Sequence, residues 1–453
     1  MAILNRRSAS IPKTDVHPVD RVLPLPTLGL FGLQHILVMY ASTVTVPVVV
    51  AAGLGLPQQD LIYLVAADLM LCGLGTLLQS LGIWNVGVKL PMVIGASYTG
   101  IAPMLVIGQG SDIQTMYGAI LVAGLFTIAV APLVSRLMRY FPPVVIGTAI
   151  VLIGIQLVPA GGKMIVGSKP DAPDFGSMSF LLLALATASA ILICYRFLPL
   201  AMRPVSVLLG IVVGVGVAAL GGLVDASPLG NGPLVAVPDL MHFGVPRFDL
   251  VACLSLVLIQ IILIVELAGQ VKAAGEVVNK PVPDTDLAKA VRADGVINAV
   301  GGGLVQSFMY VTFAQNVGIL SITKVFSRFV TAAAGVLLLA LSFFPVMGQV
   351  VAMVPRPVLG AAAVIMFGTI IVVGIQILAK VDFSQISNLV IVATGLGIGL
   401  LPNMISGFYG QVPEQLRPIL SSGVAAGLFA AVLLNLLFHH VPERRKKGAD
   451  TTH

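Results

Sequence analysis

Long apolar runs separated by short polar breaks repeat along the whole chain of 453 residues. A helix needs about 20 apolar residues to cross the hydrocarbon layer of a membrane. Runs bounded by charges, Pro and Gly predict fourteen membrane spans. Their approximate ranges are 28–51, 60–83, 90–108, 113–134, 142–160, 177–196, 204–224, 248–275, 285–304, 309–323, 329–350, 357–379, 387–406 and 418–438.

The positions of Lys and Arg agree with this number of spans. With both termini in the cytoplasm, the inner regions hold 20 of the 25 basic residues and the outer loops hold 5. Cytoplasmic loops of membrane proteins collect Lys and Arg. We therefore expect a multi-pass protein of the cytoplasmic (inner) membrane, with residues 1–27 and the basic tail 441–453 on the inner side.

The composition excludes several classes of protein. Hydrophobic residues make up 57% of the chain and charged residues 10%, and the mean hydropathy is +1.03. A soluble protein carries about 25% charged residues, so neither a soluble enzyme nor a nucleic-acid binder is expected. Cys72, Cys194 and Cys253 all lie in apolar runs, which indicates packing rather than disulfides. Residues 1–27 lack the pattern of a cleavable signal peptide.

The third span of each half is abnormal. Seven spans precede the polar stretch 225–247 and seven follow it, so the two halves would have inverted topologies. Pro91 and Pro103 bracket a short, Gly-interrupted segment in the first half, and 309–318 is polar and β-prone in the second. Paired interruptions of inverted halves point to the central binding site of a transporter. The alternative is a pair of re-entrant loops that bind no ligand.

Few ionisable residues fall inside the predicted spans, and each is costly there and hence a candidate for function. They are His35, Asp68, Glu266 and Asp294. Glu266 follows an unbroken apolar run and must be protonated, paired or bound to a hydrogen-bond donor. Each of the four also has a structural alternative, namely a satisfied contact between helices.

For Asp294 that alternative is an ion pair with Arg292 or Lys289 at the cytoplasmic end of its span. Signatures of catalysis are absent from the sequence: it contains neither HExxH, nor GxSxG, nor an ATP-binding Walker A motif. We therefore expect no enzyme activity, no cofactor and no metal. Transport would be driven by a gradient or run downhill.

Several separated motifs resemble those of one family. Gln315-Asn316-x-Gly318, followed by Thr323-Lys324, resembles the signature of the nucleobase–ascorbate transporters (nucleobase:cation symporter-2), and in particular of bacterial xanthine and uric acid permeases. Further matches are Gln34-His35, Glu266 with Gly269, and Asp294-Gly295. The similarity extends from about residue 28 to residue 440.

The resemblance implies a fold of seven plus seven spans related by an inverted repeat, with a short strand in each of the broken spans 3 and 10. It also implies a core domain and a gate domain, and a homodimer. The core would comprise 28–134 (spans 1–4) and 247–350 (spans 8–11). The gate would comprise 135–246 (spans 5–7) and 351–440 (spans 12–14).

The resemblance further implies a substrate site between spans 3, 8 and 10. Glu266 would accept hydrogen bonds from the N–H groups of a base, and the Gln315 side chain with the backbones of Ala314 and Tyr98 would bind the rest of the ring edge. Ser97 matches a position associated with selectivity among purines. Residues expected to couple protons or support the site are Asp294, His35, Asn316, Gln270 and Asp68, and those completing the signature are Gly318, Thr323 and Lys324.

Two positions depart from the family pattern. Gln270 stands where relatives carry His or Asp, and it cannot titrate, so proton exchange would fall to Glu266 or Asp294. The segment 307–312 also lacks the Pro that relatives often carry before the signature.

The first signature position helps to predict the substrate. An amide offers a donor and an acceptor to an oxopurine edge, whereas a carboxylate only accepts. Family members with Gln at this position resemble xanthine or urate carriers and those with Glu resemble uracil carriers, so the resemblance implies xanthine or uric acid for Gln315. We expect transport by proton symport through alternating access. A uracil carrier is the nearest alternative. An anion carrier or channel of similar architecture is less favoured, because Glu266 opposes an anion.

Overall fold

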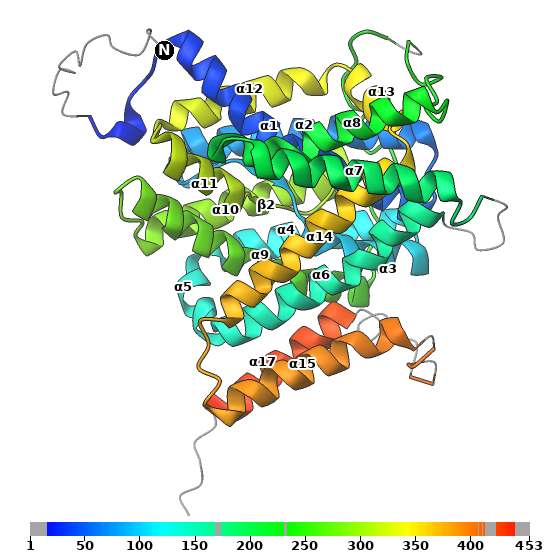
Figure 1. Ribbon diagram of the computed structural model, residues 1–453. Coiled ribbons are helices and arrows are strands. Elements are labelled where there is room, and N and C mark those ends of the chain that lie inside the picture. Colours follow the sequence, from blue (N-terminus) through cyan, green and yellow to red (C-terminus); the bar gives the residue numbers. More distant parts are fainter. Residues whose placement is uncertain are drawn as a thin grey trace, which may run out of the picture.

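The computed structural model describes residues 16–167, 174–230, 233–405, 407–409, 411–412 and 423–439 (Figure 1). Within these residues the helices are joined by turns and loops, and two strands of three residues each are the other regular elements. A helix satisfies its backbone hydrogen bonds internally, which suits apolar sequence in a membrane. The predicted fold class, a helical membrane protein with short strands in two broken spans, is confirmed.

The first half of the chain contains one of the two strands. Its elements are η1 (Pro18–Asp20), α1 (Leu25–Leu54), α2 (Gln58–Leu81), β1 (Ile94–Ala96), η2 (Tyr98–Gly100), α3 (Ile101–Gly110), α4 (Ile113–Val130), η3 (Ala131–Leu133), α5 (Val134–Leu137), η4 (Met138–Tyr140), α6 (Pro143–Val166), α7 (Met178–Phe197), η5 (Leu200–Val205) and α8 (Ser206–Leu220).

The second half repeats this order of long helices around a strand. Its elements are α9 (Leu250–Val277), α10 (Asp284–Val300), the π-helical turn η6 (Gly301–Val305), β2 (Tyr310–Thr312), α11 (Ala314–Thr323), α12 (Arg328–Ser342), α13 (Val346–Ala352), α14 (Arg356–Leu378), α15 (Ile386–Met404) and α17 (Gly423–His439).

Among the described residues, seven helices are long and apolar enough to cross a membrane, and an eighth crossing results if α12 and α13 are taken together. The seven are α1, α2, α4 with its continuation to Arg136, α6, α7, α9 and α14. α8, α15 and α17 are apolar but shorter. The chain is therefore a multi-pass membrane protein, and the number of fourteen spans stays a prediction.

One predicted span is not straight. α12 and α13 occupy the predicted span 329–350, and they meet at an angle of 80°. Pro345 stands at the N-cap of α13. Proline has no N–H to donate to the preceding turn and its ring clashes with that turn, so a helix cannot continue through it unchanged. The apolar run gave no sign of this bend, because a bend leaves the composition as it was.

The pattern of helix packing reveals the repeat. α2 packs on α12, and their counterparts α10 and α4 pack on each other. In the same way the packing of α1 on α12 corresponds to that of α9 on α4. The packing of α7 on α8 corresponds to that of α15 on α17, and α15 and α17 lie side by side in Figure 1. β1 and β2 pair antiparallel, as strands related by a twofold axis do. The two halves therefore form an inverted repeat.

Glycines let equivalent helices approach closely in both halves. A Cβ added to Gly335 of α12 would lie 3.0 Å from the carbonyl oxygen of Gly73 on α2, and one added to Gly295 of α10 would lie 3.1 Å from that of Gly124 on α4. Small residues at such crossings replace side-chain bulk with backbone contact, which drives helix association in lipid.

The helices fall into two groups by their contacts. α1, α2, α4, α9, α10 and α12 pack around the strands, whereas α6, α7, α8, α14, α15 and α17 pack mainly on one another. The first group contains the strand pair and the second contains the close crossing of α6 and α14. The domain boundaries expected above stay a prediction.

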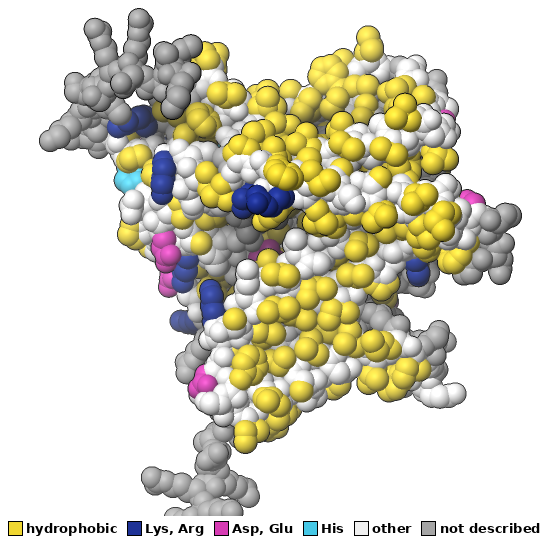
Figure 2. All heavy atoms as spheres, in the orientation of Figure 1, with side chains coloured by type: hydrophobic (Ala, Val, Ile, Leu, Met, Phe, Trp, Pro, Cys, Tyr) yellow, Lys and Arg dark blue, Asp and Glu magenta, His cyan; other side chains and the backbone are white. Residues whose placement is uncertain are grey.

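Charged and hydrophobic side chains occupy different parts of the visible surface. Figure 2 shows hydrophobic side chains over most of the visible face, and most of the visible Lys and Arg side chains lie towards the left of the view, the side on which the described chain begins. This arrangement fits a broad contact with lipid and a basic end beside it.

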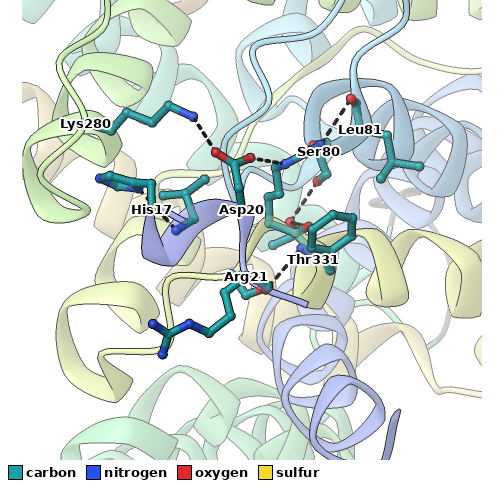
Figure 3. A network of polar contacts seen from close by, with 11 residues as sticks. His17, Asp20, Arg21, Ser80, Leu81, Lys280 and Thr331 are labelled. Atoms are coloured by element: carbon teal, nitrogen blue, oxygen red, sulfur yellow. Dashed lines mark hydrogen bonds and ion pairs between the residues drawn. The ribbon is translucent and has the colours of Figure 1, made fainter. Parts of the chain in front are cut away.

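A network of polar contacts joins the beginning of the described chain to both halves (Figure 3). Asp20 accepts hydrogen bonds from Nε of Arg328, at 2.7 Å, and from Nζ of Lys280, at 3.2 Å. Arg328 also donates to the carbonyl oxygens of Ser80 and Leu81 at the end of α2. These contacts tie η1 to α2, to α12 and to the segment between α9 and α10.

Candidate functional site

The two strands pair antiparallel among the helices of the first group. In their register Ile94 faces Thr312, Gly95 faces Val311 and Ala96 faces Tyr310. Hydrogen bonds continue beyond both ends, because Phe313 N–H donates to the Val93 oxygen at 2.8 Å and Ser97 N–H to the Met309 oxygen at 2.7 Å. Only three residues of each strand pair, so the backbone groups on the outer edges need other partners.

Side chains of α2 and α10 supply these partners. On the first strand, Ile94 N–H donates to Oγ1 of Thr76 at 3.1 Å. On the second, Tyr310 N–H donates to Oδ1 of Asn298 at 2.7 Å, and Nδ2 of Asn298 returns a bond to the Tyr310 oxygen at 3.0 Å. Each strand is thus held by a polar side chain of the helix that precedes it.

Asp294 lies one turn before Asn298 on α10 and is almost fully buried. Nε2 of Gln79 donates to its Oδ1 at 2.9 Å and also to the carbonyl oxygen of Ala290. The ion-pair alternative for Asp294 is wrong, because Lys289 binds Asp286 at 2.7 Å and Arg292 binds the backbone oxygen of Asn85.

Glu266 lies on α9, the helix that contacts β2, η2, α3 and α11. It is half-buried, and Nε2 of Gln270 donates to its Oε1 at 3.0 Å. Gly269 is on the same face of the helix and is exposed, and a Cβ added there would have no neighbour within 4 Å. The Glu266 carboxyl is thus bordered by open space and has no cationic partner among the described side chains.

Ser97 and Tyr98 follow β1 directly. The Ser97 oxygen caps η2 by accepting from Thr99 N–H at 3.2 Å. The Tyr98 ring packs edge-on against Phe367 with centroids 6.0 Å apart, and its hydroxyl lies 3.8 Å from Sδ of Met366. Both partners belong to α14, so Tyr98 lies where the two helix groups meet.

The signature residues begin α11, directly after β2. Oδ1 of Asn316 lies 3.0 Å from Nδ1 of His35 on α1, and both side chains are buried. His35 and Asn316, which belong to two separate sequence motifs, are therefore in contact in the structure. The side chains of Ala314 and Gln315 lie outside the described part of the chain, so their roles stay predictions.

The rest of the signature ends the helix. Gly318 is exposed and would offer open space to an added Cβ. The Thr323 hydroxyl donates to the Ile319 oxygen of its own helix at 2.9 Å. Lys324 adopts φ 57° at the C-cap of α11. Thr323 and Lys324 therefore have a visible structural role in helix termination.

Asp68 lies apart from Glu266, in a polar cluster behind the second strand. The Tyr310 hydroxyl donates to its Oδ1 at 2.8 Å and also contacts Oγ of Ser307 at 2.6 Å. Sγ of Cys72 is 3.6 Å from the same Asp68 oxygen. Asp68 is thus joined to β2 through one tyrosine.

The sequence interpretation missed four residues that build this site: Thr76, Gln79, Asn298 and Tyr310. All are uncharged, and none belongs to the motifs named above. The available signal was the recurrence of polar side chains inside apolar runs, since a buried polar group needs a partner.

Comparison with known proteins identifies relatives that agree with one another in being permeases. A model of the "Permease family" (Xan_ur_permease) matches residues 27–406. The uric acid permease PucJ of Bacillus subtilis is 38% identical over 411 residues, which cover 90% of this chain and 91% of that protein. The xanthine permease of the same organism is 35% identical, with 93% of this chain and 95% of that protein covered. These relatives are permeases and not enzymes.

A solved structure has a similar fold. The murine Solute Carrier 26 family member A9 anion transporter, in its inward-facing state, matches with a TM-score of 0.62 at 12% identity, covering 96% of this chain and 74% of that chain. At this identity the likeness concerns the fold alone.

Proposed function

This chain belongs to the permease family of the nucleobase–ascorbate transporters, and from that premise we propose that it imports xanthine or uric acid together with a proton. The observation that carries the proposal is the setting of Glu266. It is a half-buried carboxyl beside open space, close to the ends of both strands, and among the described side chains its partner is an amide rather than a cation.

Such a carboxyl suits a neutral, planar ring with N–H groups on its edge. A protonated carboxyl accepts a ring N–H bond through its carbonyl oxygen and donates its O–H to an acceptor on the same ring edge. α11, which follows β2, and η2, which follows β1, border the same region through their contacts with α9. Free N–H groups at a helix start favour the carbonyl oxygens of an oxopurine. Tyr98 would provide an aromatic wall.

The proposal of proton coupling rests on Glu266 having no cationic partner among the described side chains. A carboxylate in an apolar setting is costly when it has no partner, so it gains a proton or a ligand. We propose that a proton from the outer side binds the Glu266 carboxylate, that base and proton are carried together, and that the proton leaves to the cytoplasm with the base. Gln270 cannot exchange protons, so it orients Glu266.

Alternating access would move the first helix group against the second. The Tyr98 contact with Met366 and Phe367 crosses between these groups, so it would change during the cycle. We propose the boundaries 28–134 and 247–350 for the core, and 135–246 and 351–440 for the gate. The distribution of Lys and Arg supports an inner-membrane protein with both termini in the cytoplasm, and the family resemblance supports a homodimer.

The test is uptake of radiolabelled xanthine, uric acid and uracil by cells expressing the chain, with and without a proton uncoupler. We expect saturable uptake of xanthine or uric acid that collapses with the uncoupler. Glu266→Gln should lower this uptake at least ~10-fold at an unchanged amount of protein in the membrane, because an amide cannot carry the exchangeable proton that drives uptake. Glu276→Gln is the matched control, since Glu276 is an exposed glutamate of the same helix. Near-normal uptake by Glu266→Gln would refute the proposed site.

Uracil is the second candidate substrate, because a carboxylate and an amide also fit a pyrimidine edge. Competition by excess xanthine against uracil uptake distinguishes the two. Uptake of uracil that xanthine does not reduce would replace the purine assignment. An anion substrate is disfavoured, although an anion transporter shares the fold, because the Glu266 carboxylate would repel it.

A further inference from the structure

The cluster around Asp68 has no place in the proposed transport step, and its chemistry is unusual. Asp68 lies in the middle of α2, and 0% of its surface is exposed. Its described contacts are the Tyr310 hydroxyl and the Cys72 thiol, and both reach Oδ1. Its other oxygen, Oδ2, is buried without a hydrogen-bond partner. No Lys, Arg or His of the described chain pairs with it.

These surroundings fit a protonated carboxylic acid better than a carboxylate. An ionised carboxylate buried without a cation keeps almost none of the stabilisation that it has in water. A neutral acid needs fewer partners, because one acceptor for its O–H and one donor to its carbonyl oxygen satisfy it, and a hydroxyl can fill either role. Asp68 also differs from Glu266, which borders open space, so water reaches Glu266 but not Asp68.

Tyr310 connects this acid to the strand pair. It is the first residue of β2, lies opposite Ala96 and has both backbone groups bound to Asn298. Its hydroxyl also contacts Ser307 on the segment that enters the strand. The Tyr310 side chain therefore ties β2, from the second half, to α2, from the first half.

The position of this strand matters for the candidate site. The residue before Tyr310, Met309, accepts the hydrogen bond from Ser97 N–H that extends the ladder to the start of η2. A shift of β2 would move this bond and with it Ser97 and Tyr98. The opposite end of β2 leads through Phe313 into the first turn of α11.

We propose that Asp68 is a positioning residue for the purine site, acting through Tyr310 as a carboxylic acid that stays protonated throughout transport. The exchangeable proton belongs to Glu266. This inference rests on the proposed function, because its main readout is base affinity.

The experiment compares Asp68→Asn, Asp68→Leu, Tyr310→Phe and the double variant Asp68→Leu/Tyr310→Phe. KM and maximal rate of xanthine uptake are measured from pH 5.5 to 8 and normalised to the protein in the membrane. Loss of one hydrogen bond corresponds to about a 2–10-fold change in affinity, so we expect Asp68→Leu and Tyr310→Phe each to raise KM in this range. The double variant should be no worse than the poorer single variant.

Asp68→Asn is the decisive variant, since an amide keeps a donor and an acceptor but holds no exchangeable proton. It should recover most of the affinity that Asp68→Leu loses and keep the native dependence of uptake on pH. Loss of the pH dependence in Asp68→Asn would overturn the proposal, because Asp68 would then exchange the coupling proton. A native KM in Asp68→Leu, or additive effects in the double variant, would overturn it as well.

Melting temperatures of the four purified variants in detergent provide a readout that does not depend on the substrate. The effects of Asp68→Leu and Tyr310→Phe should again be non-additive, because both remove the same contact. If the native protein takes up no base, the proposed function fails while this thermal cycle still tests the pair. Additive melting temperatures would refute the pair itself.

Discussion

At the scale of single residues, the interior of this protein relies on polar contacts between side chains of different halves. His35 of α1 meets Asn316 of α11, and Gln79 of α2 meets Asp294 of α10. Each pair joins one helix of the first half to one of the second. Such contacts between membrane helices average well under 1 kcal/mol when measured in pairs, but removing one partner leaves the other unsatisfied.

The His35–Asn316 contact gives a prediction at this scale. His35→Leu should destabilise the protein by about 1–3 kcal/mol, because the Asn316 amide would stay buried without its partner. His35→Gln should recover part of this loss, since glutamine also has a donor. Melting temperatures of the purified variants measure both effects. Equal melting temperatures for His35→Leu and the native protein would show that the contact does not stabilise the fold.

Sequence reasoning identified the ionisable members of such contacts, and also Asn316 and Gln270, but it did not identify Gln79 or Tyr310. Asp294, Glu266 and Asp68 are detectable because a carboxyl in an apolar run is rare. Tyr310 and Asn298 are not, because tyrosine and asparagine occur in spans for many reasons and the sequence does not state which helix lies opposite. Only the packing of α2 on the strands shows that Asp68 and Tyr310 meet.

At the scale of elements, glycines determine how closely the helices can pack. On α6 and α14 a Cβ added to Gly147 would lie 3.2 Å from the Gly374 oxygen, and one added to Gly360 would lie 2.8 Å from the Gly161 oxygen. Gly147 and Gly161 lie on one face of α6, since they are two heptads apart. The same kind of contact joins Gly295 to α4.

Gly295→Val should reduce the amount of folded protein, because its Cβ would lie 2.9 Å from the backbone nitrogen of Ile128 and 3.1 Å from the Gly124 oxygen. Overpacking of this kind costs about 1–3 kcal/mol. Gly29→Val is the matched control, as a Cβ there has no neighbour within 4 Å. Detergent-solubilised, fluorescently tagged variants can be compared by size-exclusion chromatography. A normal monodisperse peak for Gly295→Val would contradict the expectation.

The extent of sequence prediction differs between elements. The broken spans were predictable because Pro91, Pro103 and a polar, β-prone segment interrupt otherwise apolar runs. The 80° bend before α13 was not, although Pro345 lies at it. Proline also occurs inside α1, at Pro47, without ending the helix. A proline alone therefore does not distinguish a bend from a continuous helix.

At the scale of the whole molecule, Asp20 fastens the beginning of the described chain to both halves. Burial alone would raise the pKa of this carboxyl, but hydrogen bonds from Arg328 and Lys280 outweigh it and hold the pKa below its usual value. A carboxyl with a lowered folded pKa stabilises the protein above its unfolded pKa of about 3.9. This stabilisation is lost as the pH falls through the folded pKa.

Asp20→Asn should therefore destabilise the protein at pH 7 by about 0.5–1 kcal/mol, the range for partly exposed ion pairs in solvent. The difference from the native protein should shrink at an acidic pH close to or below the lowered pKa of Asp20, where native Asp20 loses its charge. Melting temperatures at both pH values test this, with the exposed Asp174→Asn as control. A difference that persists unchanged at low pH would mean that the carboxylate charge is not responsible.

The antiparallel strand pair has a consequence for biosynthesis. Among the described residues β1 pairs with β2 alone, and their paired residues, such as Ala96 and Tyr310, are 214 positions apart. At ~5–20 residues per second a ribosome needs ~10–40 s to make the intervening chain. During this interval the first half already carries its strand but has nothing to pair with its edge. The backbone N–H and C=O groups of β1 must therefore be hydrogen-bonded to water or protected by the insertion machinery until about two thirds of the chain has been translated.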